Sequence, residues 1–288
     1  MPPVYDTARL LLKRVPGLRR FANSSPGQAL RYRIALHFED RPGFTFTQFR
    51  RLPTQLDALT GPVLDFIDAH GRADPIRIVV IGCSTGAEPY TVSSALLERW
   101  PRLAFTIDAY DVDADVLAIA CGGTYSIHTV HANPLVTATF VHNTFEQEGD
   151  RLVVKPEIAG RVRYDLADAL SPDIRLQIPL ADIVMAQNVM CNLRRPLARR
   201  LFGNIAALLK PRSALFIDGM DLDMRERCTR MHGLVPLVYE LQRIHEEARL
   251  VRGERYPHYA TGLEPFSLRP RNHERRYSTI FLRNHHVG

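Results

Sequence analysis

Lysine, cysteine and long apolar runs are all scarce in this sequence of 288 residues. Only Lys13, Lys155 and Lys210 are lysines among the 37 basic residues, a bias typical of genome-wide codon usage. The four cysteines form no CxxC pair, which excludes a disulfide framework and a zinc knuckle and is typical of a reducing cytoplasm. No apolar run approaches the roughly 20 residues of a membrane-spanning helix. We therefore predict a cytoplasmic protein without a membrane span or a metal site.

The net charge of +6 raises the question of nucleic-acid binding. Arginines gather between residues 9 and 33 and again between residues 249 and 283. Neither cluster is accompanied by a known RNA-binding signature. Nucleic acid is therefore not expected as a partner.

Strand-like and helix-like patterns alternate along the chain. A β-branched run over 76–82 has the length of a buried strand, and a helical pattern over 90–100 follows it. The later elements are strands predicted at 105–110, 181–186, 213–218 and 277–283 and a helix predicted at 195–210. Such alternation predicts an α/β fold with a mostly parallel sheet and right-handed crossovers.

Two stretches interrupt this alternation. Residues 122–163 are predicted to form a small β insertion, with a hairpin that pairs 141–145 with 152–154. Residues 240–276 are predicted to form a C-terminal insertion. We expect residues 1–75 to form a short helical segment, with a helix over 56–70, and residues 76–288 to form the α/β domain.

Two features should meet at the carboxyl edge of the sheet, where open α/β folds bind ligands. The loop that follows the first strand contains Gly82, Ser84 and Gly86, and glycines there permit close backbone approach to a ligand. Asp111 ends the second strand, where a carboxylate can accept both hydroxyls of a ribose. The pair alone fits a nicotinamide cofactor as well as S-adenosylmethionine. The sequence has no Walker lysine and no G-x-S-x-G elbow.

The wider pattern favours one of these cofactors. Residues 82–90, Gly-Cys-Ser-Thr-Gly-Ala-Glu-Pro-Tyr, resemble the G-C-S-T-G-E-E-P-Y signature of the chemotaxis-receptor methyltransferases, the CheR type. Weaker similarities follow in family order at 111–117, 123–125, 162–164 and 187–190, and residues 47–53 resemble the family's N-E-T-x-F-F-R segment. The resemblance covers roughly residues 44 to 240. It implies a class I, Rossmann-like methyltransferase sheet and S-adenosylmethionine as cofactor.

The resemblance also implies roles for individual residues. Thr47 and Arg51 match positions that hold the methionine end of the cofactor, and Glu88 matches an acid of the loop that contacts it. Asp111 matches the acid that binds the ribose, and Asp168 with Ala169 matches the pair that flanks the adenine. Gln187 and Asn188 match the Arg-Asn pair at the end of the fourth strand. These residues, together with Gly82, Ser84 and Gly86, are the predicted cofactor site.

The sequence departs from the family mainly on the acceptor side. Gln187 replaces an arginine, and Asn192 replaces a tyrosine that lies near the transferred methyl group. Fewer residues precede the match than the family's receptor-binding domain contains. Residues 250–276 carry Tyr259 and Glu264, and we expect them to contribute to the acceptor pocket. No general base is evident, and an ionised carboxylate acceptor needs none.

Three functions remain open from the sequence. The leading hypothesis is a CheR-type methyltransferase that acts on a small molecule or another non-receptor acceptor, at a carboxylate. The second is methylation of chemoreceptor glutamates, that is, of an acidic peptide side chain. The third is a regulatory module that binds the cofactor without catalysis, an alternative favoured by Asn192.

Overall fold

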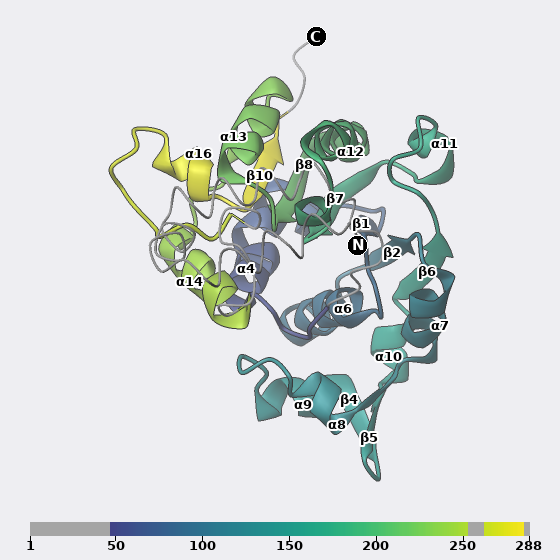
Figure 1. The fold of residues 1–288 in the computed structure, drawn as a ribbon. Helices are drawn as coiled ribbons and strands as arrows, with labels where there is room; N and C mark the ends of the chain where they lie inside the picture. The colour runs from purple at the N-terminus through teal and green to yellow at the C-terminus, as the bar shows by residue number, and fades with distance from the viewer. Residues whose placement is uncertain (1–46, 253–261, 285–288) are drawn as a thin grey trace, which may run out of the picture.

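The computed structural model describes residues 47–252 and 262–284 and shows a seven-stranded sheet with helices on both faces (Figure 1). The strands of this sheet are β1 (Ile76–Ile81), β2 (Phe105–Asp111), β6 (Val162–Leu166), β7 (Ala181–Gln187), β8 (Leu209–Asp218), β9 (Val235–Pro236) and β10 (Ile280–Arg283). The helices beside it are α4 (Pro53–Ala58), α5 (Leu64–Phe66), α6 (Ala87–Arg99), α7 (Ala114–Gly122), α10 (Pro156–Ala159), α11 (Ile174–Gln177), α12 (Arg195–Ala207), α13 (Leu222–Met231), α14 (Leu241–Arg252) and α16 (His273–Tyr277).

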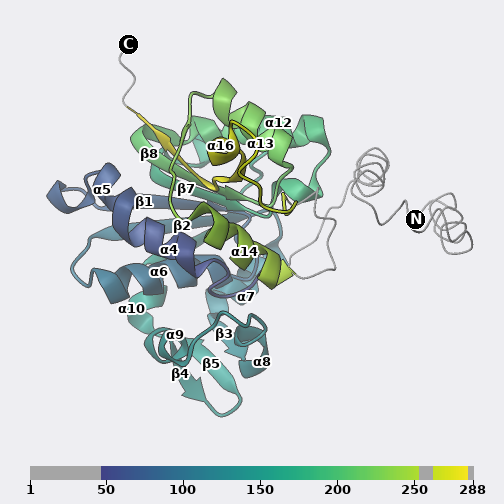
Figure 2. The same cartoon turned by 90° about the vertical axis from the view of Figure 1, so that its left-hand side faces the viewer.

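The central strands β1 and β7 are buried on both faces of the sheet, and their alternate residues point to opposite sides. In β1, Ile78 and Val80 pack with α4, α6 and α14, whereas Val79 and Ile81 pack with α12 and α13. Figure 2 shows these two helical layers on either side of the sheet. This arrangement explains why β1 and β7 are nearly continuous runs of apolar residues.

The strand order is β6-β2-β1-β7-β8-β10-β9. The first five strands run parallel, and β10 is inserted antiparallel between β8 and β9. The order of the first five is that of a doubly wound Rossmann sheet, which changes direction between β1 and β7. The predicted class I, mostly parallel α/β sheet is confirmed.

A second, smaller sheet lies between α7 and β6 in the chain. Its order is β3-β5-β4, formed by β3 (Thr124–Ser126), β5 (Arg151–Val154) and β4 (Phe145–Glu148). Two helices, α8 (Ile127–Val130) and α9 (Ala138–Thr144), connect β3 to β4. We call residues 124–154 the insertion. Its core is aromatic and also contains Phe49, from the segment that precedes α4.

Several sequence-based boundaries were wrong. The strand predicted at 213–218 begins at Leu209, and the helix predicted at 195–210 ends at Ala207. Residues 141–144 belong to helix α9, which Thr137 caps through its side chain, so the hairpin pairs only 145–148 with 151–154. The helix predicted over 56–70 is broken at Gly61, whose φ of −119° and ψ of −106° are not helical. The last strand begins at Ile280, because residues 273–277 form α16.

No helix in the described part of the chain has the length and apolar character needed to cross a bilayer. The four cysteines are all free, and Cys83 and Cys228 are buried.

Candidate functional site

The loop between β1 and α6 forms a tight cradle at the carboxyl edge of the sheet. Gly82 and Gly86 have φ angles of +72° and +87°, which disfavour any side chain. A Cβ at Gly82 would lie 2.5 Å from Cγ2 of Val189, and one at Gly86 would lie 2.6 Å from the Tyr164 hydroxyl. Only glycine fits at either position, so the backbone of this loop stays close to its surroundings.

Asp111 is held rigidly beside this loop by three backbone N–H groups. Ser84 N–H donates to Oδ2 at 2.8 Å, and the N–H groups of Val112 and Asp113 donate to Oδ1 at 2.8 and 3.2 Å. Three such hydrogen bonds fix the orientation of the carboxylate. Each oxygen has two lone pairs, so Oδ2 keeps one for a ligand hydroxyl.

Arg51 and Glu88 face each other across the start of α6. Arg51 Nη2 lies 3.9 Å from Glu88 Oε1, and about a tenth of each side chain is exposed, 10% and 11%. Burial raises the pKa of the Glu88 carboxyl from 4.5 to about 7, while Arg51 lowers it and Asp218 raises it. The pair therefore offers a ligand one cation and one carboxyl group that titrates near neutral pH.

A small cavity beside this pair is lined by Gln48 and Gln187. Both residues are more than nine-tenths buried, and among the described residues neither side-chain oxygen has a hydrogen-bond partner. Gln187 is fixed by its amide, which donates to Gln55 Oε1 at 2.6 Å. Gln55 in turn donates to Thr279 Oγ1 at 2.7 Å. Two buried acceptors without donors suit a ligand that brings N–H groups.

The remaining predicted cofactor residues lie along the same edge. Asp168 and Ala169 follow β6, and Asp168 Oδ1 accepts the N–H of Leu170 at 2.8 Å. Asn188 follows β7 with a φ of +61°, and its N–H donates to the Asp218 carbonyl at 2.9 Å. Thr47 is half-buried, one residue before Gln48. The structure thus brings the predicted cofactor residues to the carboxyl ends of β1, β2, β6 and β7.

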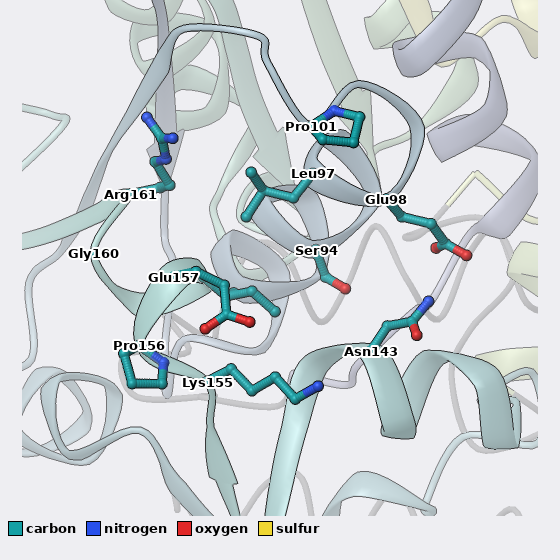
Figure 3. Close-up of a pocket in the computed structure, with 11 residues that line it drawn as sticks. Ser94, Leu97, Glu98, Pro101, Asn143, Lys155, Pro156, Glu157, Gly160 and Arg161 are labelled. Atoms are coloured by element: carbon teal, nitrogen blue, oxygen red, sulfur yellow. The ribbon is translucent and has the colours of Figure 1, made fainter.

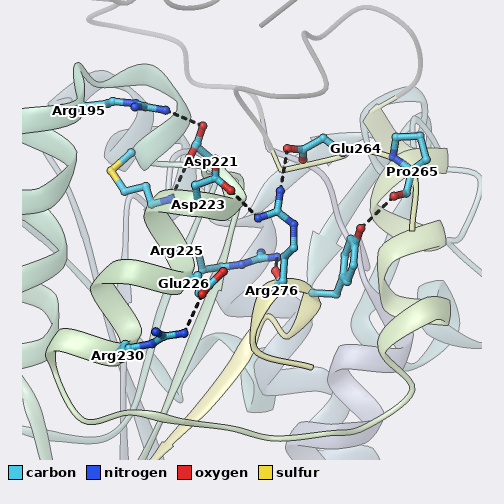
Figure 4. A network of polar contacts seen from close by, with 11 residues as sticks. Arg195, Asp221, Asp223, Arg225, Glu226, Arg230, Glu264, Pro265 and Arg276 are labelled. Carbon is cyan, nitrogen blue, oxygen red and sulfur yellow. Dashed lines mark hydrogen bonds and ion pairs between the residues drawn. The ribbon is translucent and has the colours of Figure 1, made fainter. Parts of the chain in front are cut away.

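A network of charged side chains lies past the end of β8 (Figure 4). Arg225 is 1% exposed, lies 3.7 Å from Asp218 and donates to the Arg276 carbonyl at 2.7 Å. Arg276 lies 3.8 Å from Glu264 Oε1, and Arg195 lies 3.1 Å from Asp221. The network contains both positive and negative side chains. It places Glu264, from the C-terminal segment, near the end of β8.

Glu264 is the most perturbed carboxyl of this network. Burial raises its pKa from 4.5 to about 7; Asp221 raises it further, whereas a hydrogen bond from its own N–H and the charge of Arg276 lower it. Its Oε2 atom is buried without a hydrogen-bond partner among the described residues. Of the other two predicted acceptor residues, Asn192 ends the short turn Met190–Asn192 after β7, and Tyr259 lies outside the described residues.

In the wild type, ionisation of Glu264 should lower the free energy of unfolding as the pH rises, and Glu264→Gln should remove this loss. Because the folded protein binds this proton more tightly than the unfolded chain, the stabilisation is complete below about pH 4.5 and is lost as the pH rises through about 7. The difference in free energy of unfolding, variant minus wild type, should therefore be about 2–3 kcal/mol more positive at pH 8 than at pH 4.5. Urea denaturation at both pH values measures this, and a difference independent of pH would contradict the assignment.

A hollow beside the insertion lies away from this edge (Figure 3). It measures about 670 Å³ and is lined by Leu97 and Glu98 of α6, Asn143 of α9, and residues 155–161. Its walls include Pro101 and Arg161, which precede β2 and β6. The hollow is therefore at the amino ends of the strands and is not part of the site described above.

Sequence reasoning missed several residues of the site. Asp218 was detectable in principle, because it ends a predicted strand at the carboxyl edge. Gln48 and Arg225 had no sequence signal, since their surroundings come from segments that are far apart in the chain.

The fold and the site together define a class of protein. A class I sheet carries a glycine loop after its first strand and Asp111 at the end of its second, and the Arg51–Glu88 pair lies beside that loop. The glycine cradle and the two unpartnered glutamine oxygens fit S-adenosylmethionine, which carries both a ribose and a free amino-acid end. The chain therefore contains an S-adenosylmethionine-dependent methyltransferase domain.

Comparison with known families identifies the type of methyltransferase. The family described as "CheR methyltransferase, SAM binding domain" matches residues 45–229. The chain belongs to this family, and the predicted resemblance and cofactor are confirmed.

Two curated relatives illustrate the range of similarity. The "Probable biofilm formation methyltransferase WspC" of Pseudomonas aeruginosa is 27% identical over 235 residues, which are 78% of this chain and 54% of that protein. "Chemotaxis protein methyltransferase 2" of Vibrio cholerae is 40% identical over 91 residues, 31% of this chain and 32% of that protein. The chain thus spans about half of the first relative and a third of the second.

Solved structures are more distant. An O-methyltransferase family protein from Burkholderia thailandensis is 16% identical, with a TM-score of 0.40 over 78% of this chain and 59% of that one. The magnesium protoporphyrin IX methyltransferase of Synechocystis is 13% identical, with a TM-score of 0.38 over 76% of this chain and 86% of that one. Similarity at this level carries no argument about substrate.

Proposed function

We propose that this chain transfers the methyl group of S-adenosylmethionine to a carboxylate of a small molecule or another non-receptor acceptor. The observation that carries the proposal is Asp111, fixed by three backbone N–H groups at the mouth of the glycine loop. The cofactor, when bound, supplies a methyl group already activated by its sulfonium. The protein then has to align the acceptor with that group, which can contribute about 7–11 kcal/mol to catalysis.

In this proposal, different residues at the carboxyl edge of the sheet bind different parts of the cofactor. Asp111 accepts the ribose hydroxyls, and Asp168 and Ala169 flank the adenine. Arg51 binds the carboxylate of the methionine end, while Glu88 and the oxygens of two glutamines accept its ammonium group. The other members of the proposed set are Thr47, Gly82, Ser84, Gly86 and Asn188, with Gln48 and Gln187 as the two glutamines.

The acceptor site lies past β7 and β8 in this proposal. Asn192 ends the turn after β7, and Glu264 joins the network of Arg276 and Arg225 past β8. Arginine is suited to a carboxylate because its planar guanidinium can form two parallel hydrogen bonds. A carboxylate is ionised at neutral pH, so its methylation needs no general base.

Methylation of receptor glutamates is the second candidate. The names of the curated relatives favour it, since several are chemotaxis protein methyltransferases. The replacement of the family's arginine by Gln187 and of its tyrosine by Asn192 favours a different acceptor.

Labelled methyl transfer separates these functions. The protein is incubated with S-adenosylmethionine labelled in the methyl group, together with a panel of small organic acids or with a chemoreceptor preparation. The proposal expects label on a small acid that alkali releases as methanol, as methyl esters do. Label on receptor protein alone would support the second candidate. Binding of the cofactor with no transfer to either acceptor class would contradict both and favour a regulatory module.

A further inference from the structure

One buried amide of the insertion anchors the two residues that precede Arg51. Asn133 lies between α8 and α9 and is 2% exposed. Its Nδ2 donates to the carbonyl oxygens of Phe49 at 2.8 Å and Arg50 at 3.0 Å. Its Oδ1 accepts the N–H of Leu135 at 3.0 Å. Both donors of this side chain are therefore used on the segment that leads to Arg51.

The anchored turn has a strained backbone that these contacts maintain. Arg50 has a φ of +49°, a conformation that side chains other than glycine rarely adopt. Its N–H donates to Thr91 Oγ1 at 3.1 Å, and its guanidinium donates to the Leu135 carbonyl at 2.7 Å. Because Thr91 belongs to α6, the turn is fixed between α6 and the insertion. The geometry of the turn therefore sets the position of the Arg51 backbone.

Aromatic packing joins the same segment to the insertion. The Phe49 ring makes edge contacts with Tyr125 and Phe145, at centroid distances of 4.9 and 5.2 Å. The Tyr125 hydroxyl donates to the carbonyl of Thr85, in the glycine loop. The insertion thus contacts the cofactor cleft at two points, one beside Arg51 and one in the glycine loop.

We propose that Asn133 is a positioning residue for the methionine end of the cofactor and acts through Arg51. The inference rests on the proposed role of Arg51 in cofactor binding. Without the Asn133 amide, the carbonyls of Phe49 and Arg50 lose this donor, and the strained turn at Arg50 has fewer contacts that hold it. The backbone of Arg51 is then no longer held in the position that places its guanidinium 3.9 Å from the Glu88 carboxyl.

Asn204 provides a matched control at the other end of the cleft. It lies in α12, and its Nδ2 donates to the carbonyl oxygens of Ala169 at 2.8 Å and Ser171 at 3.0 Å. Asn133 and Asn204 therefore use the same chemistry, a single amide that donates to two backbone carbonyls. Asn133 supports the proposed methionine end, and Asn204 supports the proposed adenine end.

Calorimetry with two ligands separates positioning from a general loss of structure. S-adenosylhomocysteine carries the amino-acid end, whereas methylthioadenosine has the same adenosine thioether without it. Asn133→Ala should weaken S-adenosylhomocysteine about tenfold and leave methylthioadenosine within about twofold. Asn204→Ala should weaken both ligands by the same factor, because both contain adenine.

A second substitution tests whether Asn133 acts through Arg51. In an Arg51→Met background, Asn133→Ala should change the affinity for S-adenosylhomocysteine by less than about twofold, because coupled residues are not additive. Equal losses for both ligands in Asn133→Ala, or no loss for either, would overturn the positioning role. A wild-type protein that binds neither ligand would instead contradict the proposed function and, with it, this inference.

Discussion

Replacement of Asp111 by Ala should weaken S-adenosylhomocysteine binding by about thirty- to a thousandfold. The substitution removes the charged acceptor for the ribose hydroxyls, a loss of about 2–4 kcal/mol. It also leaves the N–H groups of Ser84, Val112 and Asp113 without their acceptor, so the glycine loop loses its fixed geometry. Isothermal titration calorimetry on wild type and variant measures the effect.

Asp113 provides the control for this experiment. It lies two residues away and caps α7 by accepting the N–H of Asp115 at 2.9 Å. Asp113→Ala should lower the free energy of unfolding by about 1 kcal/mol, as loss of a helix cap does, and leave ligand affinity within about twofold. Unchanged affinity in Asp111→Ala would contradict the ribose assignment, as would tight binding of NAD by the wild-type protein.

Replacement of Arg51 by Lys should weaken S-adenosylhomocysteine about tenfold and leave the melting temperature of the free protein nearly unchanged. Lysine keeps the charge opposite Glu88 but has no planar fork to form two hydrogen bonds with a carboxylate. Calorimetry with S-adenosylhomocysteine and with methylthioadenosine should show the loss for the first ligand alone. An equal loss for both ligands, or a large fall in melting temperature, would assign Arg51 a structural role.

Arg50 should show the opposite pattern. Its guanidinium donates to the Leu135 carbonyl in the insertion at 2.7 Å. Arg50→Lys should therefore lower the melting temperature more than Arg51→Lys does. Its effect on ligand affinity should be smaller than that of Arg51→Lys, because Thr91 and Asn133 still hold the backbone of the turn through the Arg50 N–H and carbonyl groups. The two neighbouring arginines thus separate binding from support of the fold.

The sheet could be predicted from sequence because its strands are local patterns. A strand buried on both faces, such as β1 or β7, reads as an apolar run whatever its neighbours are. The hairpin was misplaced at 141–144 because the β-branched Val141 and Thr144 suggested a strand, whereas the capping bond of Thr137 starts a helix there. The break at Gly61 was missed for a similar reason: the apolar periodicity continues through it.

The site was predictable only where it is contiguous in sequence or falls at a strand end. The glycine loop and Asp111 meet both conditions, and Arg51 was found through a short motif that resembles the family's. Asn133 meets neither condition: it lies 83 and 84 residues from the carbonyls it supports. Such long-range contacts depend on how the insertion packs against α6, which no local pattern encodes.

A crystal structure of the protein with S-adenosylhomocysteine tests the central claim most directly. The account predicts the ribose hydroxyls on Asp111, the adenine between Asp168 and Ala169, and the amino-acid carboxylate on Arg51. It also predicts the sulfur atom of the ligand at the carboxyl end of β7, facing the network that contains Glu264. A ligand bound elsewhere, such as in the hollow beside α10, or one whose ribose lies away from Asp111, would contradict it.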